Sequence, residues 1–187
     1  DWSSDVCSSD LVSVMDFIPV GTNISSTDVS SYIQAAHDYI VSTGKQGTLV
    51  FPAGTYKCDS GLTIQCSWVS CLGQRAKLDF SALGDVAAIT FTAGSGNLVA
   101  GNPWNQATFV FEGFILYGPS TTTGTAMYLN ERTGGSLGGP AHTIFRDFQI
   151  TNFKTGIYFG NHTYINFFDH FDIWNVTTGI WFPVNDL

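Results

Sequence analysis

The sequence contains nearly the same hydrophobic pattern twice, with an offset of 23 residues. Residues 145–159 read FRDFQITNFKTGIYF, and residues 168–182 read FDHFDIWNVTTGIWF. The two stretches share Phe, Phe, Ile, Asn, Thr, Gly, Ile and Phe at equal positions. A fixed period of about 20–50 residues is typical of a solenoid, in which each unit buries its apolar face against the next. This unit contains only short strand and turn patterns, so it predicts stacked coils of β-structure.

A third, looser copy lies upstream of these two. Residues 111–116 align with residues 145–150, and residues 126–129 align with residues 156–159 after a loop of different length. Loops of variable length are expected in a solenoid, because they project from the stack without disturbing it. The predicted fold is therefore an all-β parallel β-helix with coils about 4.8 Å apart. The side chains expected to point inward from the last two coils are Phe148, Ile150, Ile157 and Phe159, with Phe171, Ile173, Ile180 and Phe182 above them.

Two polar or small positions also repeat. Asn152 and Asn175 occupy the same place in successive units, where an inward Asn side chain bonds the backbone of the next coil. The sequence therefore predicts a ladder of asparagines. Gly156 and Gly179 are predicted to mark the corner before the next strand.

One amphipathic helix is predicted upstream, over residues 28–43. Val29, Ile33, Ala36 and Ile40 fall on one helical face, Thr27 or Asp28 is placed to cap the start, and Gly44 follows the end. An open end of a solenoid needs a cover, so we expect this helix to be the lid of the first coil. Residues 12–20 are predicted as an extended lead-in and residues 133–140 as a loop. Further short strands are predicted at 48–51, 56–58, 61–65, 68–72, 76–80, 87–91, 108–116 and 126–129.

Composition excludes several classes of partner. The chain has 187 residues, with 7 Lys and Arg against 15 Asp and Glu. This acidic balance argues against a nucleic acid or an anionic lipid surface, both of which need a basic footprint. No apolar run approaches the roughly 18 residues of a membrane span. The four cysteines form no CxxC pair and lie at no zinc-ligand spacing, so we expect no metal and no cofactor. They are interpreted as buried thiols, with one bridge from Cys58 to Cys66 or Cys71 as the alternative.

The two ends of the chain are treated separately. Residues 1–11, DWSSDVCSSDL, show no apolar periodicity and are similar to the translated read-through of a sequencing adapter. We therefore expect residues 1–11 to be unstructured and foreign to the gene. Residues 12–187 are expected to form the N-terminal part of one β-helix domain that is truncated at its C-terminus.

Several segments resemble one known superfamily. They are VSVMDFIP, the helix YIQAAHDYI, GTLVFPAGTYKC and GLTIQCSWVSCLG. Together they resemble the pectate-lyase-like right-handed parallel β-helix proteins, and bacteriophage tailspikes in particular, over residues 12–187. One departure is at residues 21–29, GTNISSTDV, where many members carry the acidic stretch GDG-x-x-DDT.

The resemblance implies a function. Tailspikes of this type are virion-tail homotrimers that bind and cut bacterial surface polysaccharide by hydrolysis or by lyase chemistry. Two alternatives remain open: a structural or glycan-binding β-helix without catalysis, and a secreted bacterial enzyme similar to pectinases.

The repeat places a pair of carboxylates on one outer face. Asp147 aligns with His170 and Gln149 aligns with Asp172, and all four are predicted to point outward. The diagonal from Asp147 to Asp172 is then about 8 Å, within the separation of an inverting glycosidase pair, about 6.5–9.5 Å. Asp147 and Asp172 are the candidate catalytic residues, and His170 beside them is a candidate for substrate contact. The alternative is a set of solvated surface charges.

Outward aromatic side chains form further candidates. Tyr128, Tyr158 and Trp181 are predicted to form one column, and Trp174 is predicted to lie in a parallel row with Tyr117. Such rows can stack against sugar rings, or they can pack against another subunit or a loop. We assign them to substrate binding, with packing as the alternative. Another column is predicted to be structural, a ladder of ion pairs formed by Glu112, Arg146 and Asp169.

Overall fold

The computed structural model describes residues 11–93, 109–130, 143–160, 163 and 166–182 and confirms the predicted right-handed parallel β-helix with an N-terminal helix. The short 3₁₀-helix η1 spans Val14–Asp16, and the helix α1 spans Ser30–Ser42. The strands are β1 (Leu11–Ser13), β2 (Gly47–Phe51), β3 (Thr55–Lys57), β4 (Leu62–Gln65), β5 (Val69–Asp79), β6 (Ala87–Thr92), β7 (Phe109–Tyr117), β8 (Thr125–Leu129), β9 (Thr143–Thr151), β10 (Thr155–Phe159), β11 (Phe167–Trp174) and β12 (Thr178–Trp181).

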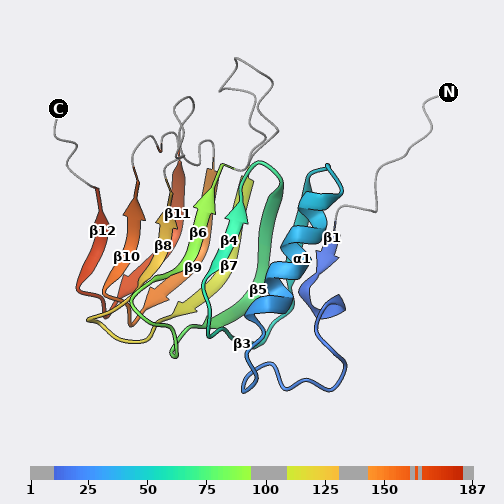
Figure 1. The fold of residues 1–187 in the computed structure, drawn as a ribbon. Coiled ribbons are helices and arrows are strands. Elements are labelled where there is room, and N and C mark those ends of the chain that lie inside the picture. Colours follow the sequence, from blue (N-terminus) through green and yellow to red (C-terminus); the bar gives the residue numbers. More distant parts are fainter. Residues whose placement is uncertain (1–10, 94–108, 131–142, 161–162, 164–165, 183–187) are drawn as a thin grey trace, which may run out of the picture.

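The strands form two parallel sheets, A and B, which enclose the core between them and extend along the solenoid (Figure 1). Sheet A has the order β1-β2-β5-β7-β9-β11, with β3 beside β5, and sheet B has the order β4-β6-β8-β10-β12. Neighbouring strands in a sheet come from successive coils; the first coil contributes both β2 and β3 to sheet A and β4 to sheet B. Parallel pairing of this kind requires the chain to return to the same side after every coil.

The register of the strands confirms the repeat. Phe168 of β11 pairs with Phe145 of β9, which is the 23-residue offset of the sequence. Phe145 in turn pairs with Phe111 of β7, so the looser upstream copy is also in register. In sheet B, Tyr158 pairs with Tyr128 on one side and with Trp181 on the other. Equal positions of the repeat therefore lie directly above one another.

The core between the two sheets contains aliphatic side chains and many aromatic rings, some of which stack from coil to coil. Phe145 stacks on Phe168 with ring centroids 4.8 Å apart, and Phe148 stacks on Phe171 at 5.3 Å. Burying one such side chain contributes roughly 1.5–3 kcal/mol. The inward residues of the earlier coil are buried, whereas Phe171 and Ile173 are only half-buried because they lie in the last described coil.

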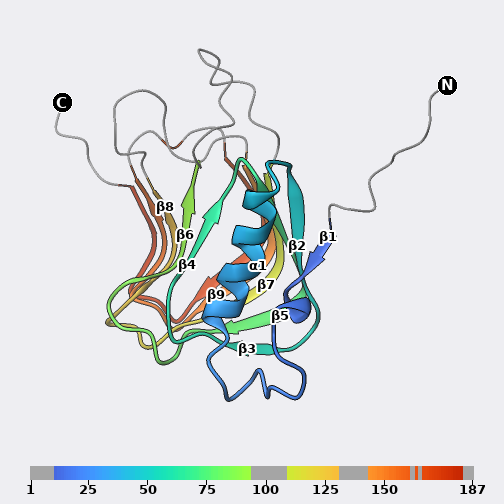
Figure 2. The ribbon, with the colours of Figure 1, turned by 45° about the vertical axis from the view of Figure 1, so that its right-hand side comes forward.

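Sheet A bends sharply along one column of residues. Arg75, Gly113, Asp147 and His170 all have positive φ, at 59°, 80°, 51° and 45°. A single left-handed residue turns the strand without ending it, and Asp and His adopt this conformation more readily than most side chains do. Figure 2, in which the coils are seen closer to end-on, shows sheet A continuing from the side of the coil onto its base. We call this set of four residues the bend column.

The predicted hydrogen bonds of Asn152 and Asn175 are present and mark a second corner, although Asn152 is only half-buried and Asn175 is exposed, not inward. Asn152 and Asn175 have φ of 63° and 53°. The Nδ2 of Asn175 donates to Oδ1 of Asn152 at 3.3 Å, and the Nδ2 of Asn152 donates to the Gly118 carbonyl at 2.8 Å. The prediction that Gly156 and Gly179 mark the corner is wrong, because both lie inside strands. Gly156 is needed there for close packing, since a Cβ would lie 2.6 Å from the Gly179 carbonyl oxygen.

Helix α1 covers the first coil, as predicted. Figure 2 shows it lying across the opening between the two sheets. Ile33, Ala36 and Ile40 are buried on its inner face. The Oδ1 of Asp28 accepts from the Ser30 amide at 3.0 Å at the start of the helix, and Gly44 has φ +68° after its end.

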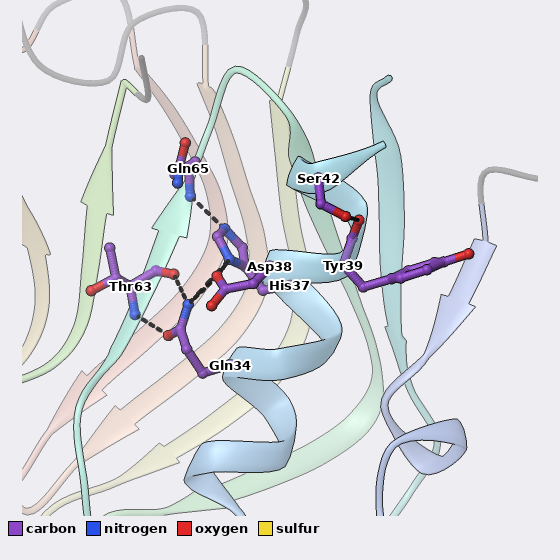
Figure 3. A network of polar contacts seen from close by, with 7 residues as sticks. All are labelled: Gln34, His37, Asp38, Tyr39, Ser42, Thr63 and Gln65. Atoms are coloured by element: carbon purple, nitrogen blue, oxygen red, sulfur yellow. Dashed lines mark hydrogen bonds and ion pairs between the residues drawn. The ribbon is translucent and has the colours of Figure 1, made fainter. Parts of the chain in front are cut away.

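Polar side chains of α1 form hydrogen bonds with backbone groups of the edge strand β4 (Figure 3). The Gln34 side chain accepts from the Thr63 amide at 2.9 Å and donates to the Thr63 carbonyl at 3.1 Å. The Nε2 of His37 accepts from the Gln65 amide at 3.0 Å, and its Nδ1 lies 2.8 Å from Oδ1 of Asp38. An open strand edge invites pairing with another chain, so the helix protects this edge as well as the core.

The buried His37 predicts a loss of stability in mild acid. Burial lowers the pKa of His37, although Asp38 opposes this, and protonation of Nε2 removes the acceptor of the Gln65 amide. As the pH falls below about 6.5, the ordinary pKa of His, the His37 side chain is protonated in the unfolded state before it is protonated in the folded state. This contribution to stability is full above that pH and is lost below it, by at most about 1.4 kcal/mol per pH unit. Urea unfolding between pH 7.5 and 5 measures it.

A matched variant isolates that contribution. His37→Gln lacks the titrating group, so its free energy of unfolding is expected to fall less between pH 7.5 and 5. Tyr39→Ala, at an exposed position of α1, serves as the control and should keep the wild-type slope, because it leaves His37 and its hydrogen-bond partners in place. An unchanged slope in His37→Gln contradicts the assignment.

The remaining predictions differ in detail. The lead-in is only partly extended, because β1 ends at Ser13 and η1 follows. The two strands predicted at 68–72 and 76–80 are one bent strand, β5. Leu11 begins β1, whereas residues 1–10 and the predicted loop at 133–140 lie outside the described residues.

Three cysteines lie within the described residues, and none of them forms a disulfide bond there. Cys58, Cys66 and Cys71 are buried free thiols, and burial raises the pKa of each. Within the described ranges, no helix has the length and apolar character to cross a membrane. No group of three His, Cys, Asp or Glu side chains there is placed to hold a metal ion.

Candidate functional site

The bend of sheet A carries a groove of about 350 Å³ on its outer face. We call it the bend groove. Its walls come from strands β5, β7, β9 and β11, so successive coils each contribute side chains to it. The lining residues are Arg75, Gly113, Phe114, Ile115, Asp147, Phe148, Gln149, His170 and Asp172.

The predicted grid of outward polar residues is present in this groove. Asp147, Gln149, His170 and Asp172 are all exposed. Asp172 pairs in register with Gln149, and the Nε2 of Gln149 donates to Oδ2 of Asp172 at 3.4 Å. Asp147 and His170 occupy equal positions in the bend column. The two candidate carboxylates therefore lie one coil apart along the same groove.

The neighbouring charges are paired and lie beside the groove. The guanidinium of Arg146 donates from Nε and Nη2 to Oε2 of Glu112 at 2.8 and 2.6 Å, and this pairing raises the pKa of Arg146. The predicted ladder of Glu112, Arg146 and Asp169 is therefore confirmed only for its first pair. The Oδ2 of Asp169 lies 3.1 Å from Nδ1 of His170.

The aromatic column of sheet B is confirmed. The rings of Tyr128 and Tyr158 meet edge to face with centroids 5.2 Å apart, and Trp181 lies in register above Tyr158. Trp174 is more than half exposed. The predicted row of Tyr117 and Trp174 is interrupted, because both residues pair with Thr151 from opposite sides.

Arg75 and Gly113 belong to the bend groove and were not predicted as site residues, and neither were Phe114 and Ile115 in its lining. Arg75 lies outside the repeats, at the place where the register of β5 against β7 shifts. Gly113 aligns with Asp147 and His170 in the repeat, and all three are residue types that tolerate positive φ. That coincidence is the signal that could have located the bend from the sequence.

The fold is shared with solved structures of carbohydrate-active and viral proteins. The A-module of a mannuronan C-5 epimerase from Azotobacter vinelandii matches with a TM-score of 0.58 and 15% identity, over 91% of this chain and 53% of that one. The protein ORF18 of Geobacillus virus E2 matches with a TM-score of 0.57 and 19% identity, over 87% and 36%. A mutant tailspike protein of Escherichia coli bacteriophage HK620 was solved in complex with a pentasaccharide. It matches with a TM-score of 0.53 and 18% identity, over 89% of this chain and 36% of that one.

These matches establish the architecture. The chain has the parallel β-helix fold of phage tailspikes and of mannuronan epimerase modules. It spans between about a third and about a half of the length of these three proteins. No protein-family model matches the sequence, and no curated protein matches it.

Proposed function

We propose that this chain is part of a protein that binds and degrades bacterial surface polysaccharide. The bend groove is the observation that carries the proposal, because it collects two carboxylates, an imidazole, an amide and a guanidinium on a rigid sheet. Hydroxyl-rich ligands are bound by such groups, and a groove lined by several successive coils suits a polymer. The tailspike with a bound pentasaccharide and the mannuronan epimerase add a fold-level analogy.

Two reaction classes fit this site. In an inverting hydrolysis, one carboxyl of the pair Asp147 and Asp172 gives its proton to the glycosidic oxygen, and the other accepts a proton from the attacking water. The water oxygen bonds to the anomeric carbon while the bond to the leaving sugar breaks. In a lyase reaction, a base removes a proton next to the carboxyl group of a uronic acid, and the glycosidic oxygen leaves. Only the second reaction creates a carbon–carbon double bond.

An assay on the full-length protein separates these classes. A panel of capsular and exopolysaccharides is incubated with the protein, and reducing ends and near-ultraviolet absorbance are recorded. New reducing ends with new absorbance indicate a lyase, and new reducing ends alone indicate a hydrolase. Binding without new reducing ends on every polymer of the panel contradicts degradation.

The second candidate is a β-helix that binds glycan without cutting it. The exposed aromatic column of sheet B favours this alternative, because it presents ring surface without a paired acid and base. For the degrading protein we propose a homotrimer in a virion tail, with a secreted bacterial enzyme similar to pectinases as the alternative location and class.

A further inference from the structure

The outer face of sheet B differs from that of sheet A in its charge. The five strands of sheet B contain no Asp, Glu, Lys, Arg or His. Strands β5, β7, β9 and β11 of sheet A contain nine such residues, including those of the bend groove. The outward positions of sheet B are filled mainly by Thr and aromatic side chains. This face therefore offers hydroxyl groups and aromatic ring surface, and its strands carry no charged side chain.

A hollow of about 260 Å³ lies on this face, between the turn before β6 and the outward side chains of β8 and β10. We call it the sheet B hollow. Its volume is below the roughly 300–1,000 Å³ of pockets for drug-sized ligands, so it suits one small cyclic unit. The lining residues are Asp85, Val86, Ala87, Thr125, Tyr128 and Tyr158.

The two tyrosines form a corner of the hollow. Their rings are inclined at 79° with centroids 5.2 Å apart, so they offer surfaces in two directions. The in-register pairing of β8 with β10 fixes the two side chains on a sheet rather than on a loop. Aromatic faces carry partial negative charge and attract the weakly positive C–H groups of a sugar ring.

The turn that carries Asp85 is tied to the strand beside it. The Oδ1 of Asp85 accepts from the Gly124 amide at 3.0 Å, and the Val86 carbonyl accepts from the Thr125 amide at 3.1 Å. These bonds hold an exposed carboxylate at the edge of the hollow, next to the Thr125 backbone. A fixed carboxylate accepts hydrogen bonds from sugar hydroxyls and repels anionic sugars.

From this arrangement we propose that the sheet B hollow binds one neutral pyranose unit of a polysaccharide. The sugar ring lies against Tyr128 and Tyr158, and its hydroxyls donate to Asp85 at the edge. The inference rests on the proposed function and adds a second glycan site on the other sheet, separate from the bend groove. Its ligand is uncharged, because the strands of sheet B supply no cation and Asp85 supplies an anion.

Affinity electrophoresis of the full chain tests this site without requiring cleavage. The gels contain dextran, mannan or galactan as neutral probes, and alginate or polygalacturonate as anionic probes. We expect retardation by at least one neutral polymer that depends on Tyr158, whereas retardation by alginate or polygalacturonate at the bend groove should be the same in Tyr158→Ala and the wild type. Tyr158→Ala is expected to raise the apparent dissociation constant about tenfold, and Asp85→Asn about fivefold. Tyr39→Ala, which removes an exposed tyrosine on α1, is the matched control and should leave retardation unchanged.

The outcomes separate this site from the bend groove. Cleavage is measured in parallel on the same polymers, and a protein without cleavage but with Tyr158-dependent retardation refutes only the proposed degradation. Equal retardation of Tyr158→Ala and the wild type by the neutral probes overturns the inference, as does no retardation by any neutral probe. The inference is also overturned if Tyr158→Ala changes the sedimentation coefficient but not glycan binding. The outer face of sheet B is then a contact between copies of this chain. Asp85→Asn keeps the acceptor for Gly124 and guards against misfolding as the cause.

Discussion

Replacing Asp147 or Asp172 with Asn is expected to lower kcat/KM for polysaccharide cleavage by about 10²–10⁴-fold. This is the usual contribution of a positioned acid or base, and Asn can neither donate nor accept the proton. Both side chains are exposed on a rigid sheet, so the substitutions should leave the fold intact. The measurement is the initial rate of reducing-end formation by the full-length protein on the polymer identified by the panel assay.

Asp16→Asn is the control for these variants, because Asp16 is an exposed carboxylate in η1, remote from sheet A's bend groove. It should keep the wild-type rate. If both groove variants also keep that rate, Asp147 and Asp172 are surface carboxylates and the catalytic assignment is wrong. If only one variant is slowed, the pair is not the acid and base of one reaction.

The second large effect concerns Gly113, where we expect Gly113→Ala to lower the free energy of unfolding by at least about 3 kcal/mol. A Cβ at this position would lie 1.8 Å from the Gly73 carbonyl oxygen of the coil below. The atom it meets belongs to the backbone, so no side chain can move aside. The positive φ of 80° adds strain for any residue with a Cβ. Urea unfolding followed by circular dichroism measures the change, provided that the m-value stays constant.

Two other glycines separate the causes. Gly21 has a similar φ of 87° with nothing within 4 Å of an added Cβ, so Gly21→Ala reports the backbone strain alone, about 1–2 kcal/mol. Gly84 has open space as well and no positive φ, so Gly84→Ala should stay within about 0.5 kcal/mol of the wild type. A Gly113→Ala variant that is no less stable than Gly21→Ala would show that the coils do not approach this closely.

The repeat made the stacking predictable from sequence. Equal residues such as Phe145 and Phe168 are in register because only that alignment buries both apolar faces. The outward direction of Asp147 and Asp172 followed from the alternation of side chains along each strand. The lid helix was equally predictable, since its apolar spacing is helical, although the burial of the polar residues Ser30 and His37 on it was not predicted.

The bend of sheet A was not predictable in the same way. A strand pattern gives the alternation of faces, but not the one residue at which the strand turns through positive φ. Asp147 and His170 are therefore classified correctly as outward residues, while the groove between them depends on the turn itself. Arg75 enters the groove through an irregularity of β5 that the sequence does not reveal. The sheet B hollow likewise depends on the turn at Asp85, which is ordered by a bond to a distant amide.

The most direct test of the in-register stacking is a disulfide between two coils. Arg146 and Asp169 are partners in neighbouring parallel strands, about 4.8 Å apart, which suits the Cα separation of a disulfide. In a Cys7→Ser background, the pair Arg146→Cys and Asp169→Cys should form an intramolecular disulfide under mild oxidation of the folded protein. The pair Arg146→Cys and Trp174→Cys, separated by more than about 10 Å, should not. Equal cross-linking of the two pairs, or none in the first pair, would contradict the stacked architecture.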